Sequence, residues 1–140
     1  MKNNGFTLIE ALFAILLVGL AIASLMGANT AFTRSNGAGA ELSTAEFLLE
    51  QVKELTATLP YDDLDDFAGA SPFSPPISAD EDRTPLADFA AFTQQVTVQN
   101  VSASNFGLVV EYPTDFVRVT VRVLHNSAEI SSASWIRARY

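Results

Sequence analysis

Positions 11–33, near the N-terminus, form 23 consecutive residues without a charged side chain. The overlapping segment 6–28 has 18 apolar residues among its 23. About 20 apolar residues, each rising about 1.5 Å along a helix, span the hydrocarbon core of a bilayer. We therefore expect this end of the chain to form a single membrane-spanning helix.

The acidic residues lie mainly in the middle of the chain. Twelve of the 16 Asp and Glu residues fall between positions 41 and 88, and the formal net charge is -8. Nucleic acids and anionic lipid headgroups attract Lys and Arg. This charge therefore argues against nucleic-acid binding and against adsorption to an anionic membrane surface. The chain has no cysteine, which excludes disulfides and thiolate metal sites.

The residues before the apolar run do not form an ordinary secretory signal, because the leader has only five residues and no small-residue cleavage site closes the run. Glu10 stands near the start of the expected helix. A carboxylate inside a membrane is costly, and it is a functional hypothesis by default. The alternative is that Glu10 only reaches back to the membrane surface from an ordinary anchor.

A short string at this position carries a family resemblance. It reads Gly5-Phe6-Thr7-Leu8-Ile9-Glu10, and an apolar run follows it directly. This pattern resembles the class III signal of type IV pilins and type II secretion pseudopilins, over roughly residues 1–60. The resemblance implies that a prepilin peptidase cuts between Gly5 and Phe6 and methylates the new amino group of Phe6. It also implies that Glu10 neutralises the amine of a neighbouring subunit in a filament.

The resemblance further implies a non-enzymatic structural role. Its partners would be other pilin or pseudopilin subunits, the prepilin peptidase and an inner-membrane assembly platform. The protein would be a single-pass inner-membrane protein with its head outside the cytoplasm, and later part of a pilus or pseudopilus. The alanine-rich anchor, small head and lack of cysteine favour a minor subunit. A competing hypothesis is an uncleaved, membrane-anchored binding protein.

The rest of the chain shows a helical pattern followed by a strand pattern. Residues 29–59 read as a continuation of the helix up to Pro60, with a weak point at the glycines of 35–39. Its apolar positions recur every three or four residues: they are Leu42, Ala45, Leu49, Val52, Leu55 and Leu59. Strands are expected at 92–101, 108–112, 116–124 and 130–139, with a turn at 125–127.

These patterns predict an α+β fold of the pilin type, in which a long N-terminal helix packs on a small antiparallel sheet of three or four strands. The expected segments are a leader at 1–5, a transmembrane or filament-core helix at 6–33, an amphipathic helix half at 34–59, a Pro- and Asp-rich loop region at 60–91 and an antiparallel sheet head at 92–140. Within the loop region, 71–76 should run extended on the surface, held by Tyr61, Leu64 and Phe67.

No pattern of a catalytic site is present, and we expect no cofactor and no metal site. Calcium is a minor alternative, because carboxylates supply its oxygen ligands: the candidates are Asp62, Asp63, Asp65 and Asp66. The single histidine, His125, is expected to be a polar turn residue.

Four arginines stand late in the chain, with Arg118 and Arg122 on one strand face and Arg137 and Arg139 on another. Two hypotheses follow: these arginines face the acidic residues of the next subunit in a filament, or they pair with acidic residues of their own chain.

Overall fold

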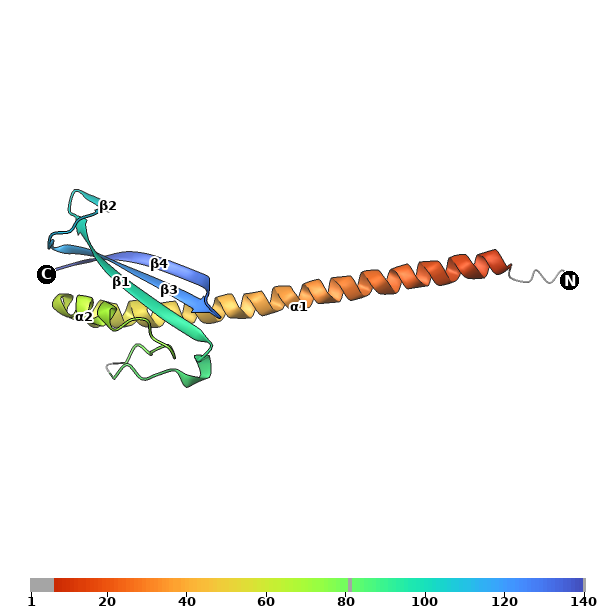
Figure 1. Ribbon diagram of the computed structural model, residues 1–140, viewed down its shortest axis with the longest axis horizontal. Helices are drawn as coiled ribbons and strands as arrows, with labels where there is room; N and C mark the ends of the chain where they lie inside the picture. Colours follow the sequence, from red (N-terminus) through yellow and green to blue (C-terminus); the bar gives the residue numbers. More distant parts are fainter. Residues whose placement is uncertain (1–6, 81, 140) are drawn as a thin grey trace. The chain divides into compact units, whose positions relative to one another are not determined.

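The computed structural model describes residues 7–80 and 82–139, and the chain divides into two compact units, Met1–Gly39 and Ala40–Tyr140. We call residues 7–39 the anchor unit and the described residues from Ala40 on the head unit. Helix α1, Leu8–Thr58, contributes to both units (Figure 1). The short helices that follow are η1 (Tyr61–Asp63), α2 (Leu64–Gly69) and η2 (Ala87–Phe89), and four strands complete the chain.

The anchor unit is helical from Leu8 on, and all of its residues are exposed. Among the described residues, α1 is the helix long and apolar enough to cross a membrane. The hydroxyls of Ser24, Thr30 and Thr33 donate to backbone carbonyl oxygens four residues earlier, at 2.5, 3.0 and 3.0 Å. These polar groups are thus satisfied inside the helix, as a hydrocarbon environment requires. The helix also continues through 35–39, so the expected weak point is not an interruption.

In the head unit, the apolar stripe of α1 packs on the sheet. The buried residues of α1 are Ala45, Leu48, Leu49, Val52, Leu55 and Thr56. They are spaced three and four residues apart, which places them on one side of the helix. Two expectations need correction here. Leu42, which was expected in the stripe, is 48% exposed, because sheet and loops cover the stripe only from Ala45 on. Leu48, which the expected stripe omitted, is fully buried in the core.

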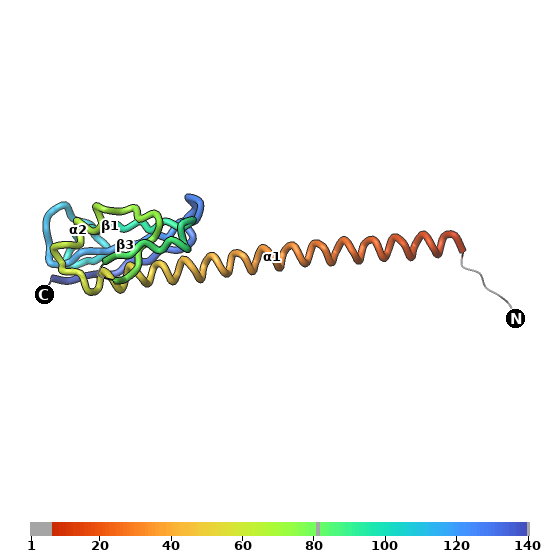
Figure 2. The backbone as a smooth tube through the Cα atoms, turned by 90° about the horizontal axis from the view of Figure 1, so that it is seen from below, coloured from red at the N-terminus to blue at the C-terminus, as the bar shows by residue number. Residues whose placement is uncertain are grey.

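The sheet has four antiparallel strands in the order β2-β1-β3-β4. Their bounds are Phe92–Ser102 for β1, Asn105–Val109 for β2, Phe116–His125 for β3 and Ala128–Ala138 for β4. Alternate valines of β3 (117, 119, 121 and 123) are buried, and the last three join the α1 stripe in one hydrophobic core. The α+β, pilin-like fold expected from the sequence is therefore confirmed within the head unit. Figure 2 shows the same elements from below.

The strand positions agree with expectation except for the second one. It covers Asn105–Val109 and not 108–112, because Val109 pairs with Val101 and Asn105 with Ser102 in the register of β1. The expected turn after β3 is present: Asn126 and Ser127 have φ angles of 50° and 68°. Two adjacent residues with positive φ are typical of the tight turns that join antiparallel strands.

The loop region 60–91 is more structured than its composition suggests. Leu64 and Phe67 are buried as expected, and Tyr61 is half-buried. However, Pro76 is fully buried and Ile77 is 6% exposed, so the segment expected on the surface enters the core at its end. The backbone of Phe73 also exchanges two hydrogen bonds with Gln94, at 2.9 and 3.1 Å. This pairing with β1 is what draws the loop inward.

Candidate functional site

Glu10 lies in the first turn of α1 and is exposed. The backbone N–H of Glu10 donates to Oγ1 of Thr7 at 3.3 Å, so the side chain of Thr7 satisfies one of the free N–H groups at the start of the helix. Carboxylates are favoured at helix N-termini, where the backbone dipoles leave a partial positive charge. The expected processing residues Gly5 and Phe6 lie outside the described residues.

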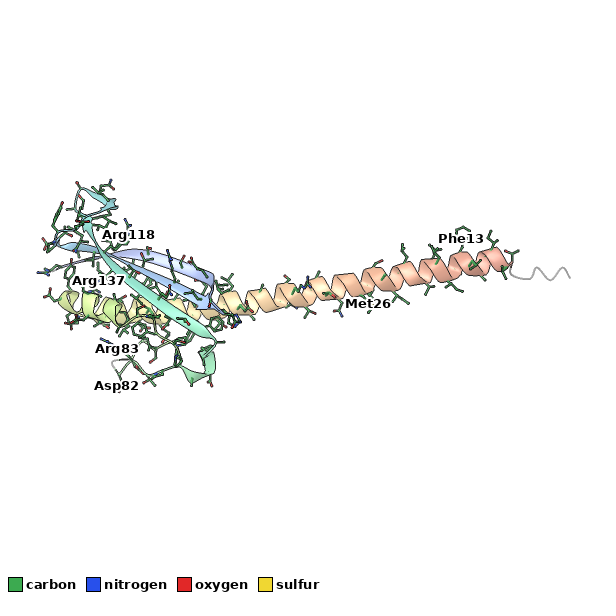
Figure 3. The ribbon with its side chains drawn as sticks, viewed as in Figure 1. Phe13, Met26, Asp82, Arg83, Arg118 and Arg137 are labelled. Carbon is green, nitrogen blue, oxygen red and sulfur yellow. The ribbon has the colours of Figure 1, made fainter. Side chains whose placement is uncertain are left out.

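The residues after Glu10 present large apolar side chains all around the helix. Leu12, Phe13, Leu16 and Leu20 are each at least 58% exposed, and Figure 3 shows Phe13 and Met26 projecting from α1. No residue of the anchor unit is buried by another described part of that unit. A surface of this kind requires lipid or other protein segments around it.

A row of small residues follows α1 at intervals of four. It consists of Gly19, Ala23, Gly27, Ala31 and Ser35. Residues four apart lie on the same face of a helix. A Cβ atom added to Gly19 or Gly27 would meet nothing within 4 Å, so the packing of the chain itself does not require these glycines. The sequence analysis missed this row, although the recurrence of small residues every fourth position would have revealed it.

The four aspartates considered for calcium are all exposed, and they lie on two consecutive short helices. Asp62 and Asp63 belong to η1, while Asp65 and Asp66 belong to α2. Asp62 already accepts a hydrogen bond from Arg139 at 2.6 Å. Across residues 7–80 and 82–139, no group of three or more His, Asp or Glu side chains is placed to hold a metal ion.

His125 is the last residue of β3 and contacts two other parts of the head unit. Its Nδ1 lies 3.4 Å from Oε1 of Glu41 on α1. Its ring stacks on Phe92 with 4.6 Å between the ring centroids. The side chain thus joins the sheet to α1. His125 was expected in the turn itself, but it is the last residue of β3 and pairs with Ala128, so the turn consists of Asn126 and Ser127.

Each of the four late arginines contacts its own chain. Arg118 donates to the carbonyl oxygen of Phe106, and Nε of Arg122 lies 3.6 Å from Glu129. Arg139 pairs with Asp62 and lies over the Tyr61 ring, 4.7 Å from its centroid. These contacts favour the hypothesis that the arginines are satisfied within the subunit.

Arg137 binds the end of α1 and is a structural residue. Its guanidinium donates to the carbonyl oxygens of Ala57 at 2.5 Å and Leu59 at 3.1 Å. The last carbonyls of a helix lack partners within the helix, and a cation near them is favoured by the helix dipole. Figure 3 shows Arg137 on the sheet beside this end of the helix. Sequence alone placed Arg137 on a strand face but did not reveal this partner.

Residues 1–26 match the family model of the prokaryotic N-terminal methylation motif. No curated protein and no solved structure matches the chain. The matched region contains the Gly5, Phe6 and Glu10 positions and most of the apolar segment 6–28. The motif and the apolar helix together support anchoring of the chain in a membrane. The chain therefore carries, at its N-terminus, the methylation signal of type IV pilins and pseudopilins.

Proposed function

We propose that the chain is a structural subunit of a type IV pilus or of a type II secretion pseudopilus. The observation that carries the proposal is the division of one continuous helix into two surfaces. Between Leu8 and Gly39, α1 is exposed on all sides, whereas from Ala45 to Thr56 it supplies the core of the head unit. Together with the methylation motif at 1–26, this fits a subunit that is anchored first in lipid and later among other subunits.

In this proposal a prepilin peptidase removes residues 1–5 and methylates the amino group of Phe6. Glu10 then stands in the first helical turn of the mature chain. When the apolar helices are bundled, the carboxylate of Glu10 is removed from water, and a buried charge is tolerated only when it is paired. The amine of Phe6 on a neighbouring subunit supplies the opposite charge.

Assembly exchanges lipid for protein around the same apolar surface. Because lipid tails are as apolar as leucine, close packing has to supply much of the association energy, and small residues allow helices to approach closely. Successive small residues such as Gly19, Ala23 and Gly27 provide such a face. The partners are other subunits, the prepilin peptidase and the assembly platform of the inner membrane, with the head outside the cytoplasm.

The mass of the native protein tests the processing step. We expect an N-terminus that begins with methylated Phe6 in cells that contain an active prepilin peptidase. A chain that still begins with Met1 would instead support the competing function, an uncleaved membrane-anchored binding protein.

Substitutions of Glu10 test the assembly step. Glu10→Ala and Glu10→Gln should both insert into the membrane but fail to enter sheared filaments, because neither can pair with the Phe6 amine. Glu54→Ala, which removes an exposed carboxylate from the head part of α1, is the matched control and should assemble normally. Normal assembly of both Glu10 variants would refute the ion pair.

Two finer points of the proposal have their own measurements. The expectation of a minor subunit predicts far fewer copies of this chain than of the main subunit in purified filaments. The proposed role needs no catalytic group and no cofactor, so calcium should leave the unfolding midpoint of the protein unchanged.

A further inference from the structure

Residues 35–39, which read Ser-Asn-Gly-Ala-Gly, form the last part of the anchor unit. All five residues are helical and exposed. The buried positions of α1 begin only at Ala45, and a Cβ atom added to Gly37 or Gly39 would meet nothing within 4 Å. The hydrogen bonds of the helix itself are therefore the main restraint on this stretch.

The composition of 35–39 makes this part of α1 intrinsically weak. Each helical glycine costs up to about 1 kcal/mol relative to alanine, and serine and asparagine also rank below alanine. Short stretches of helix are marginal in water unless tertiary packing supports them. Exposed segments with few packed contacts open locally at a low free-energy cost. We therefore expect 35–39 to open more readily than the buried part of α1, 45–56.

Asn36 stands in this stretch and is followed directly by Gly37. The backbone nitrogen that follows an asparagine can attack Cγ of the asparagine side chain, and glycine hinders this approach least because it has no Cβ. While α1 is intact, the N–H of Gly37 donates to the carbonyl oxygen four residues earlier, on Thr33. The attack therefore has to wait until the helix opens at this point.

We propose that Asn36 is a site of spontaneous covalent modification, at which opening of the helix lets the Gly37 nitrogen close a succinimide ring. This nitrogen loses its proton and forms a bond to Cγ of Asn36, while the Cγ–Nδ2 bond breaks and ammonia leaves. Water then breaks the bond from the nitrogen to Cγ, which gives aspartate, or the bond to the backbone carbonyl carbon, which gives isoaspartate. Water is the only other reactant.

The modification changes both the charge and the path of the main chain. Either product adds one carboxylate, two residues from Arg34, which is the only basic residue between Lys2 and Lys53. Isoaspartate also carries the main chain through the side-chain carbon, and the extra atom breaks the regular spacing of helical hydrogen bonds. The result is a permanent interruption of α1 just before the head unit. It applies equally to a filament subunit and to an uncleaved anchored protein.

The other asparagines in the described part of the chain lack this combination. Four of them are followed by residues that carry a side chain, and they are Asn29, Asn100, Asn105 and Asn126. Asn126 is the strictest comparison, because it is exposed in a turn and its neighbour Ser127 is small. A second Asn-Gly pair, Asn4-Gly5, lies outside the described residues and within the expected leader.

Peptide mapping of the full chain in detergent micelles tests the site. The protein is incubated at neutral and at mildly alkaline pH and is then digested with trypsin. The digest contains fragment 35–53, whose only asparagine is Asn36, and fragment 123–137, whose only asparagine is Asn126. We expect aspartate and isoaspartate to accumulate in fragment 35–53, faster at the higher pH because base removes the Gly37 proton, and much more slowly in fragment 123–137. Electron-transfer fragmentation distinguishes the two products.

Glycine variants separate the reaction from the opening of the helix. Gly37→Ala places a methyl group beside the attacking nitrogen and should nearly abolish the conversion. Gly39→Ala keeps the reacting pair but favours the helix, so the conversion should slow about fivefold, which corresponds to about 1 kcal/mol. Gly69→Ala, the same substitution at an open position of α2, is the matched control and should leave the rate unchanged.

Three results would overturn the proposal. The first is a fragment 35–53 that stays unmodified in the folded chain while it converts in urea, since the helix would then protect Asn36 completely. The second is equal conversion of Asn36 and Asn126. The third is an unchanged rate in Gly39→Ala, which would exclude helix opening as the step that permits the attack. The fluorescence of Trp135, half-buried against the core, verifies that the head of each variant is folded.

Discussion

The side-chain amide of Gln94 on β1 donates a hydrogen bond to the backbone carbonyl oxygen of Leu48 on α1, with 2.8 Å between Nε2 and the oxygen. Gln94 is fully buried. Its Oε1 accepts a hydrogen bond from the backbone N–H of Ile77 at 2.8 Å. One polar side chain therefore ties the helix, the loop region and the sheet together inside the core.

Replacing this amide should destabilise the head. Gln94→Leu keeps a similar volume but leaves the N–H of Ile77 without a partner, and an unsatisfied buried group costs about 1–3 kcal/mol. We expect the free energy of unfolding to fall by about that amount. Denaturant unfolding followed by the fluorescence of Trp135, the only tryptophan, measures it in detergent micelles. Gln99→Leu, at an exposed position of β1, is the control, and an equal loss there would contradict the role of Gln94.

The apolar stripe of α1 provides a second comparison. Leu48 is fully buried, whereas Leu42 is 48% exposed. Leu48→Ala should cost about 2–5 kcal/mol of stability, because it removes buried apolar surface and leaves a cavity. Leu42→Ala should cost much less, within about 0.5 kcal/mol, as is usual at exposed positions. The same unfolding experiment distinguishes them, and similar losses would show that Leu42 packs in the core.

The cap on the end of α1 can be tested at Arg137. Arg137→Ala frees the carbonyl oxygens of Ala57 and Leu59, which the guanidinium now binds. Hydrogen bonds from charged donors contribute about 1.5–3 kcal/mol, so we expect a loss of stability of that order, partly reduced by water. Arg122→Ala removes only an exposed ion pair with Glu129 and should change stability by about 0–1 kcal/mol. Equal effects of the two variants would argue against the cap.

The contact between Thr84 and Asp80 predicts that the stability of the head depends on pH. The N–H of Thr84 donates to Oδ1 of Asp80 at 2.8 Å, and this hydrogen bond lowers the pKa of Asp80 below its ordinary value of 3.8. Because the folded-state pKa is depressed, the contribution to stability is present above pH 3.8 and is lost as the pH falls through the lower folded value.

Asp80→Asn provides the comparison for that effect. The difference in unfolding free energy between the native chain and Asp80→Asn should be constant at neutral pH and should shrink as the pH falls below about 4. Chemical-shift titration of Asp80 measures its pKa directly. A value at or above the ordinary one would contradict the assigned hydrogen bond.

The periodicity of the sequence was sufficient to predict the main helix and the strands of the sheet. A continuous apolar segment, followed by an apolar position every three or four residues, predicts α1, and the alternating valines of β3 predict a half-buried strand. The turn beside His125 was also predictable. These features depend on the spacing of residues close together in the chain, which can be read directly from the sequence.

The errors arise where distant segments decide the outcome. Pro76 stands in a segment typical of surface loops, yet it is buried because Phe73 pairs with Gln94. Leu42 fits the helical pattern but lies beyond the part that the sheet covers. The second strand was predicted three residues too late in the sequence, because the position of β2 is set by its pairing with Val101 on the neighbouring strand.

The candidate site shows the same difference between features that the sequence alone predicts and features that depend on the fold. The sequence by itself determined the methylation signal around Gly5 and Phe6, the position of Glu10 in an apolar helix and the row of small residues, since all of these depend on neighbours a few positions away. Only the tertiary structure decided that Arg137 caps α1 and that Gln94 joins three segments. Those relationships join residues far apart in the chain, and packing of the folded head brings them into contact.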